Sequence, residues 1–210
     1  FKPIKNAKSE TEIWEFFHNV VEEIKEEEKI YFDVTHGFRY QPMMVMSVLN
    51  YVKVLKNAQI EKIFYGRYEG RENSEVIDMT TLDYLNDWVT AVDSFLSTGS
   101  AEKIADLSQE EIAKVMKATR GKDEFFRNLR GLVKSLKTFE DTLTSCRGKE
   151  LNRAVNNVLS CLANLSEDDN LRNERILPFV ELIDKIKEKF DYFEAGEDKE
   201  IKNYFHALQW

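Results

Sequence analysis

One stretch decides the fold of this 210-residue chain: Ile30-Tyr31-Phe32-Asp33-Val34-Thr35-His36-Gly37-Phe38-Arg39. It opens with β-branched and aromatic residues, which favour an extended conformation, and Gly37 permits a sharp turn before an apolar segment that begins near Pro42. This order predicts a buried strand, a loop and then a helix. In open α/β sheets, ligands bind beyond the carboxyl ends of strands, because backbone N–H groups and the N-terminus of the next helix converge there.

The segments on both sides complete a β-α-β pattern. Ser9 and Glu12 match a capping box at the start of an amphipathic helix that continues to Ile24. Residues 43–55 are apolar on nearly every side, which predicts a helix buried against more than one neighbour. Residues 60–65 predict a second strand ending at Gly66. The two strands should be parallel neighbours, so residues 35–39 and 66–69 are expected at the same edge of the sheet.

Helical patterns dominate after Thr80. The first predicted helix covers residues 80–98, with Gly99 as its C-cap, and the second runs from a cap at Ser108 and Glu111 to about Arg120. Further helices are predicted over residues 125–143, 151–165, 178–190 and 201–210, and residues 168–173 are predicted to form an exposed connection. The predicted fold class is therefore α/β over residues 1–79, followed by an all-α domain over residues 80–210. Two or three short strands cannot cover a buried central helix, so further strands are expected from upstream sequence or from another chain.

Composition limits the function classes. A net charge of −8 argues against holding long nucleic acid by bulk charge, whereas residues 38–71 carry six basic and two acidic side chains and could attract an anion. Cys146 and Cys161 lie in helical patterns without metal-ligand spacing, which predicts reduced thiols in a cytoplasmic protein. No apolar run has the length of a membrane span, and no signal-peptide pattern is present. Because the chain starts at Phe1 rather than Met, we expect it to be part of a longer protein.

Asp33, Thr35 and His36 could be read as a catalytic cluster, but their spacing supports this poorly. Thr35 and the adjacent His36 make no nucleophile–base pair without a third, orienting group. Asp33 and His36 lack further His or Cys residues at metal-binding spacing. The structural alternative is that Asp33 caps a turn, His36 is a loop histidine and the nearby aromatic residues fill the core.

The same stretch suits a nucleotide site better. The Thr35 hydroxyl, the N–H groups of residues 36–38 and Arg39 can donate to phosphate or ribose, and Gly37 allows close approach of the backbone. Gly66 and Arg67, at the end of the second strand, are expected at the same edge. Flat side chains that could stack on a purine also lie at the ends of the two strands: Phe38, Tyr40, Tyr65 and Tyr68.

The run from Asp33 to Arg39 resembles the signature of the CRISPR-associated proteins named for a DxTHG motif, whose sensory part is a CARF domain. Phe64-Tyr65-Gly66 and the run Val76-Ile77-Asp78-Met79-Thr80 before the Trp88 helix add to the likeness, which covers about the first half of the chain.

The resemblance implies a partial Rossmann-like CARF sensor, usually homodimeric, that binds cyclic oligoadenylate in type III CRISPR defence and regulates an attached HEPN ribonuclease acting on RNA. It assigns Asp33, Thr35, His36, Gly37, Phe38 and Arg39 to the ligand loop, whereas Gly66 and Arg67 are added from sheet geometry. It implies no cofactor besides the ligand.

Two departures from the family pattern affect the enzyme prediction. The first strand and the Gly- or Ser-containing loop of the family's sensor do not precede Phe1 in this sequence. HEPN nucleases carry an Arg four to six residues before a His, and none of His18, His36 and His206 has one. Nuclease residues are therefore expected beyond Trp210. The alternatives are a ring nuclease that cleaves its own cyclic ligand, and a structural module that binds no nucleotide. Ring size, RNA preference and oligomer size stay open.

Overall fold

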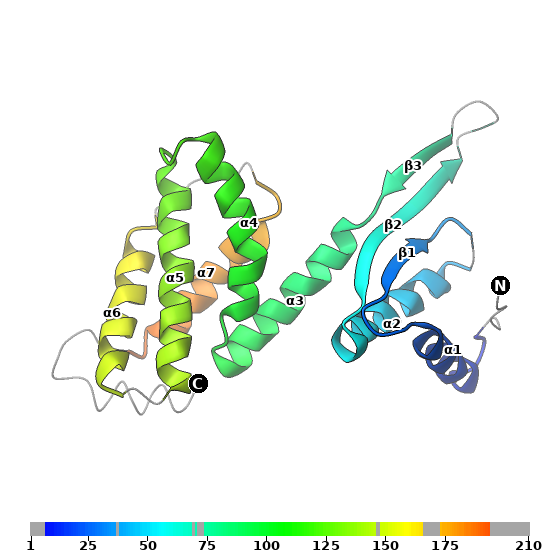
Figure 1. Ribbon diagram of the computed structural model, residues 1–210, viewed down its shortest axis with the longest axis horizontal. Coiled ribbons are helices and arrows are strands. Elements are labelled where there is room, and N and C mark those ends of the chain that lie inside the picture. Colours follow the sequence, from blue (N-terminus) through cyan, green and yellow to red (C-terminus); the bar gives the residue numbers. More distant parts are fainter. Residues whose placement is uncertain are drawn as a thin grey trace. The chain divides into compact units, whose positions relative to one another are not determined.

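The computed structural model describes residues 7–36, 38–68, 70, 74–145, 148–165 and 173–193. The backbone divides into two compact units, Phe1–Asn86 and Asp87–Trp210 (Figure 1). The first contains α1 (Glu10–Glu23), β1 (Lys29–Asp33), α2 (Tyr40–Lys56), β2 (Gln59–Tyr68), β3 (Ser74–Asp78) and the start of α3 (Thr81–Thr98). The second contains the rest of α3, then α4 (Glu102–Ala118), α5 (Glu124–Thr144), α6 (Gly148–Ala163) and α7 (Leu177–Phe190). The predicted class, α/β followed by a helical region, is confirmed.

The sheet of the first unit has the strand order β1-β2-β3. β1 and β2 are parallel, with Asp33 opposite Phe64, which confirms the β-α-β unit around α2. β2 and β3 are antiparallel, with Gly66 opposite Val76. The prediction that the second strand ends at Gly66 is wrong, because pairing with β3 carries β2 on to Tyr68.

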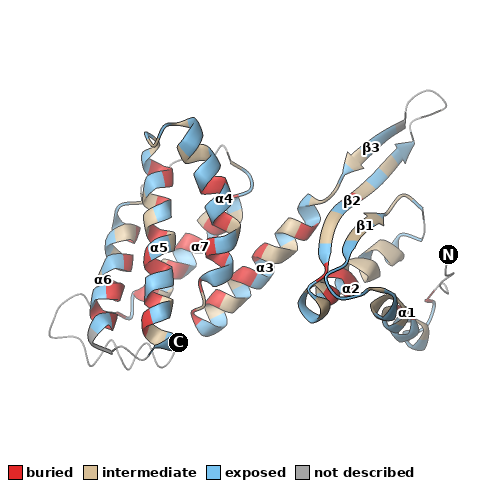
Figure 2. Ribbon diagram, viewed as in Figure 1, coloured by how far each residue is buried: buried red, intermediate tan, exposed pale blue. Residues whose placement is uncertain are grey.

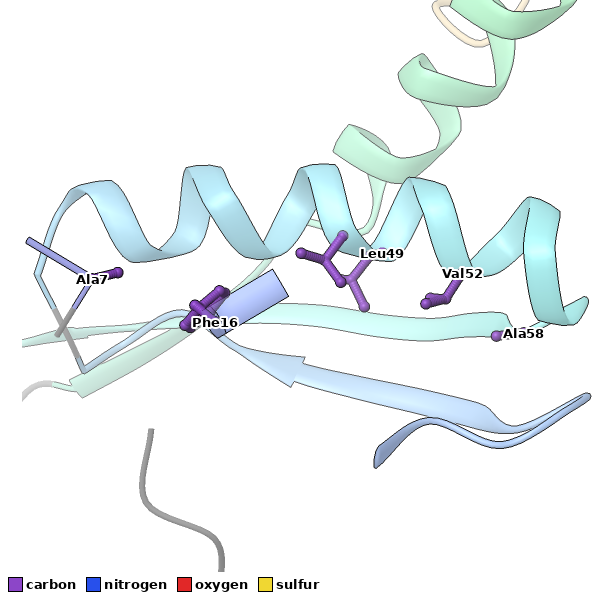
Figure 3. Packing of buried hydrophobic residues seen from close by; sticks show 6 residues of the cluster. Ala7, Phe16, Leu49, Val52 and Ala58 are labelled. Carbon is purple, nitrogen blue, oxygen red and sulfur yellow. The ribbon is translucent and has the colours of Figure 1, made fainter. Parts of the chain in front are cut away.

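The core of the first unit lies between α1, α2 and one face of the sheet. Its buried residues include Phe16 of α1 and Leu49 and Val52 of α2 (Figure 3). Ser9 is confirmed as the N-cap, since the Glu12 N–H donates to its hydroxyl at 3.3 Å, whereas the Glu12 carboxylate accepts the N–H of Lys8 at 2.6 Å and not that of Ser9. At the other end of α1, Lys56 Nζ of α2 donates to the carbonyls of residues 21 and 24, at 2.5 Å each, and so satisfies acceptors that the helix leaves unpaired.

α2 is less enclosed than its composition predicts. Val48, Leu49 and Val52 are buried, whereas Met43 is 73% exposed and Val54 is 80% exposed (Figure 2). The prediction of more than one neighbour is confirmed, since α2 packs against α1 and against the sheet, but these two neighbours leave one side of the helix exposed. The methionines divide in the same way: Met44 and Met46 pack against the core, and Met43 does not.

The second unit is a helical assembly with a dense apolar interior. α5 packs against α4 and α6, and α6 packs against α7. Leu129, Leu132 and Leu136 of α5 are fully buried at helical spacing, which identifies the packed face of this helix (Figure 2). Phe139 contacts Phe190 edge-to-face, with ring centroids 4.9 Å apart, and this contact ties α5 to the end of α7.

The predicted cap at Ser108 is wrong, since α4 begins at Glu102. Glu140 of α5 supplies the cap: its carboxylate accepts from the Ser100 hydroxyl at 2.6 Å and from the Ala101 N–H at 3.1 Å. Ser108 instead lies buried inside the helix and donates to the Ile104 carbonyl at 2.6 Å. The remaining predicted helices correspond to α3, α5, α6 and α7, and Gly99 ends α3 with a φ of 75°.

Several predictions concern residues outside the described part of the chain. They include Gly37 of the loop, Cys146, most of the connection at 168–173 and the helix at 201–210. Cys161 is described, and it is a free cysteine. Among the helices that the structure describes, none has the length and apolar composition needed to cross a membrane.

Candidate functional site

The first strand ends in a tight turn closed by its own side chain. Asp33 Oδ1 accepts the Thr35 N–H at 2.8 Å, and the Val34 N–H donates to the Phe64 carbonyl at 2.9 Å. Hydrogen bonds from Thr35, first from its hydroxyl and second from its backbone, lower the pKa of Asp33. The Asp33 carboxylate therefore works as a turn cap, as the structural alternative for this residue proposed.

Thr35 joins this turn to β2. Its hydroxyl oxygen accepts the Gly66 N–H at 2.7 Å, so the two predicted segments do meet at one edge of the sheet. A side chain at position 66 would place its Cβ 3.1 Å from both Cγ2 and Oγ1 of Thr35, closer than ordinary contact. The absence of a side chain at Gly66 thus leaves room for the Thr35 side chain.

His36 is the next residue, and it is an exposed loop residue. Among the described residues it makes no hydrogen bond, and its charge lowers the pKa of Asp33 only as a minor cause. The Thr35 hydroxyl is engaged by Gly66 and Asp33, not by His36. Among the described residues of this turn, the structure therefore brings no nucleophile and base together.

The N-terminus of α2 opens onto the same loop. Arg39 occupies its N-cap position without a side-chain capping bond, and the first turn contains no acidic residue. Gln41 holds the loop in place, because its Oε1 accepts the Phe38 N–H at 3.0 Å while its own N–H donates to the Phe38 carbonyl at 2.9 Å. Phe38 and Tyr40 stack at 5.7 Å with an interplanar angle of 10°. Exposed rings and a cation thus lie at a helix N-terminus that favours anions.

β2 separates the other predicted residues. Side chains of neighbouring strand residues point to opposite faces, so Arg67 lies on the face of β2 opposite the one that Gly66 shares with Thr35. Tyr65 lies with Arg67, and Tyr68 lies with Gly66 on the other face. Both tyrosines are exposed, and because they lie on opposite faces of β2 they cannot both belong to one stacking platform. Arg71 lies outside the described residues.

A small hollow lies next to the loop on the α2 side of the sheet. It encloses about 160 Å³ and is lined only by apolar side chains: Val34, Pro42, Met43, Met46, Ile63, Met79 and Leu82. None of these side chains can pair with the polar edge of a base, so the hollow supports packing and not base recognition.

A second Asp-x-Thr turn was missed by the sequence analysis. Asp78 Oδ1 accepts the Thr80 N–H at 2.9 Å, and the Thr80 hydroxyl oxygen accepts the Ile63 N–H of β2 at 3.1 Å. Asp78 also forms an ion pair with Lys62, and this pair is the largest cause of its lowered pKa. The signal was available, because Asp78-Met79-Thr80 repeats the pattern of Asp33-Val34-Thr35 at the end of another strand. Gln41 was also missed, since an isolated glutamine carries no motif.

A metal does not fit the described residues. They contain no group of three or more His, Cys, Asp or Glu side chains that could hold an ion. The arrangement offers instead an exposed imidazole, an exposed guanidinium, a stacked aromatic pair and an uncapped helix N-terminus.

One protein family and one individual protein share sequence similarity with this chain. Residues 2–71 match the model of the family described as "CRISPR system endoribonuclease Csx1, CARF domain". The chain is also 30% identical over 147 residues to CRISPR-associated protein MJ1674 of Methanocaldococcus jannaschii. That alignment covers 65% of this chain but only 23% of the relative, so the chain spans less than a quarter of that protein.

Proposed function

We propose that this chain belongs to an accessory effector of type III CRISPR defence that senses cyclic oligoadenylate, and the support is the match of residues 2–71 to a CARF-domain model and the likeness to a CRISPR-associated protein. The observation that carries the proposal is the convergence of His36, Arg39 and the stacked Phe38–Tyr40 pair at the uncapped N-terminus of α2. A cyclic oligoadenylate presents phosphates and purines in alternation, and these are the groups that such donors and rings bind.

Each part of the loop has a separate task in this proposal. Arg39 binds a phosphate at the positive end of the α2 dipole, with His36 as an additional donor. The exposed ring of Phe38, supported by Tyr40, stacks on an adenine. Asp33, Thr35 and Gly66 do not touch the ligand in this scheme but hold the loop against β2. Arg67 contributes only long-range positive charge.

The complete site requires two copies of the loop. A ring of repeated nucleotides has rotational symmetry, and a two-fold homodimer would present the same loop to opposite sides of the ring. The HEPN ribonuclease output and its RNA substrate rest on the family resemblance, because the helical unit carries no Arg and His at the spacing of that nuclease.

The test is calorimetric titration of the full-length protein with cyclic tetra-adenylate, cyclic hexa-adenylate and linear oligoadenylate. We expect one cyclic ligand to bind best and Arg39→Gln to weaken it roughly 10- to 100-fold, since hydrogen bonds to charged groups contribute about 1.5–3 kcal/mol. Arg153→Gln, an exposed arginine of α6, is the matched control and should bind as wild type. Absence of heat with every cyclic ligand would refute the proposal.

The same samples distinguish the two enzymatic alternatives. Chromatography of the ligand after incubation detects ring cleavage, and a labelled RNA detects ribonuclease activity that depends on the ligand. We expect the ligand to survive, because the Thr35 hydroxyl is engaged in holding β2. Consumption of the ligand without added RNA would identify a ring nuclease instead.

A further inference from the structure

The second unit contains a groove that plays no part in the proposed sensing site. It lies between α4 and α5, which are joined by a short connection, and has a volume of about 580 Å³. Its residues on α4 extend from Ala105 to Met116, three helical turns or about 16 Å. Its residues on α5 extend over the same length, from Arg130 to Asp141.

Much of the groove lining is aliphatic. Ala105, Ile112, Ala113 and Met116 of α4 and Val133 of α5 contribute it, with Gln109 and Thr138 as the neutral polar residues. The lining contains no aromatic residue on which a nucleobase could stack.

The part of the lining that α5 contributes is rich in cations. Arg130, Lys134 and Lys137 line the groove at positions i, i+4 and i+7 of α5, about one helical turn apart. None of these three side chains forms a hydrogen bond or an ion pair with any described residue. Some lysines of this unit are paired, for example Lys114 with Glu110 at 2.8 Å and Lys187 with Asp184 at 3.0 Å. Arg130, Lys134 and Lys137 differ from the other exposed cations of this unit in that all three line one groove.

We propose that this groove binds an amphipathic α-helix with an acidic flank, contributed by a partner protein. An apolar ridge of such a helix packs on the aliphatic lining residues, and carboxylates one turn apart face Arg130, Lys134 and Lys137. The one-turn spacing of the cations matches the spacing of carboxylates along a helix lying parallel to the groove axis. Asp141 lies at the end beyond Lys137, where the positive N-terminus of the bound helix would be favoured.

The test uses a fluorescent model peptide and the full 210-residue chain. The peptide is a helix of about 18 residues, long enough to be helical in isolation, with leucines on one face and glutamates on one flank. Its counterpart has lysines in place of the glutamates, and a labelled oligouridylate serves as the nucleic-acid probe. Fluorescence anisotropy measures each affinity.

We expect saturable binding of the glutamate helix only. Joint replacement of Arg130, Lys134 and Lys137 by glutamine should weaken it about tenfold, the product of three exposed ion pairs of modest strength. Ala113→Trp, which fills the groove from an exposed position, should abolish binding while circular dichroism shows the helices intact. Joint replacement of Lys103, Lys117 and Lys122 by glutamine, exposed lysines outside the groove lining, is the matched control and should change the affinity less than twofold.

Four results would overturn the proposal. They are no binding of the glutamate helix, equal binding of the lysine helix, binding that neither groove variant affects, and tighter binding of oligouridylate that the glutamine replacements in the groove abolish. The last result would assign the groove to nucleic acid. The sensing proposal is unaffected by any of them, because its residues lie in the other unit.

Discussion

Two Asp-x-Thr turns in the first unit have the same hydrogen bonds but lead into different segments of the chain. In each turn the threonine N–H donates to the aspartate Oδ1, at 2.8 Å for Thr35 and 2.9 Å for Thr80. In each, the threonine hydroxyl accepts a backbone N–H of β2, from Gly66 or from Ile63. The central strand is thus held from both sides by the same device.

The segments after the two turns differ. After Thr80 the chain enters α3 at once, and Asp78 is neutralised by Lys62. After Thr35 comes an exposed loop before α2, and Asp33 has no ion pair among the described residues. The aspartate and the threonine therefore serve the backbone in both turns. In the proposed function, ligand recognition is left to the residues after Thr35.

The largest expected effect is that of Gly66→Val, which should disturb the turn at Thr35 and not the turn at Thr80. The new side chain would meet Thr35, whose position is fixed by hydrogen bonds, so we expect a loss of stability of about 1–3 kcal/mol in the free energy of unfolding. Urea unfolding monitored by circular dichroism measures it. The matched control is Gly131→Ala in α5, where a Cβ would lie 3.6 Å from Cys161 Sγ in ordinary contact; it should be neutral or stabilising by up to about 1 kcal/mol. Equal stability of Gly66→Val and wild type would contradict the role of Gly66 in giving Thr35 clearance.

Thr35→Val and Thr80→Val test whether the turns are equivalent for folding but not for binding. Each removes one hydroxyl acceptor at nearly constant volume, so each should cost about 1 kcal/mol in the free energy of unfolding. Only Thr35→Val should also weaken cyclic oligoadenylate binding in calorimetry, because only that turn carries the loop. If Thr80→Val weakened ligand binding as much as Thr35→Val did, the proposed division of roles would be wrong.

The smallest expected effect is a change in how the melting temperature depends on pH in acid. Both aspartates have pKa values below their ordinary value, so each stabilises the fold above an unfolded-state pKa of about 3.9 and loses this contribution as pH falls through the folded-state pKa. Melting temperatures measured between about pH 2 and pH 7 should therefore fall less steeply in acid for Asp78→Asn than for wild type. Asp33→Asn should change the slope less, because Asp33 lacks a lysine partner among the described residues. The reverse order would show that the Lys62 pair contributes little in solution.

Local patterns of the sequence predicted most of the fold. The Ser9/Glu12 cap is confirmed because both partners lie within one helical turn. The cap at Ser108 failed because the group that caps α4, Glu140, is 40 residues from Ser100 in sequence and meets it only after α5 packs. The end of β2 was misplaced for the same reason, since pairing with β3 extends the strand past a glycine.

The candidate site was predicted in part. The meeting of Thr35 with Gly66 was expected from the parallel β-α-β pattern and is present. The sequence could not reveal that the Thr35 hydroxyl would be occupied by Gly66, or that Gln41 would hold Phe38, since both depend on the path of the loop in space. Because side chains alternate along a strand, the face of the sheet on which Arg67 lies can be predicted, but only once Gly66 is known to lie inside the strand.

The loop between Thr35 and Gln41 is attached at both ends by bonds to its own neighbours and to β2. Substitutions at His36 and Arg39 therefore leave the sheet and its core untouched, and they can accumulate without loss of the folded state. In evolutionary terms this makes the loop an exchangeable segment on a constant frame, and under the proposed sensing function changes at only these few positions would alter which ring size or base is bound.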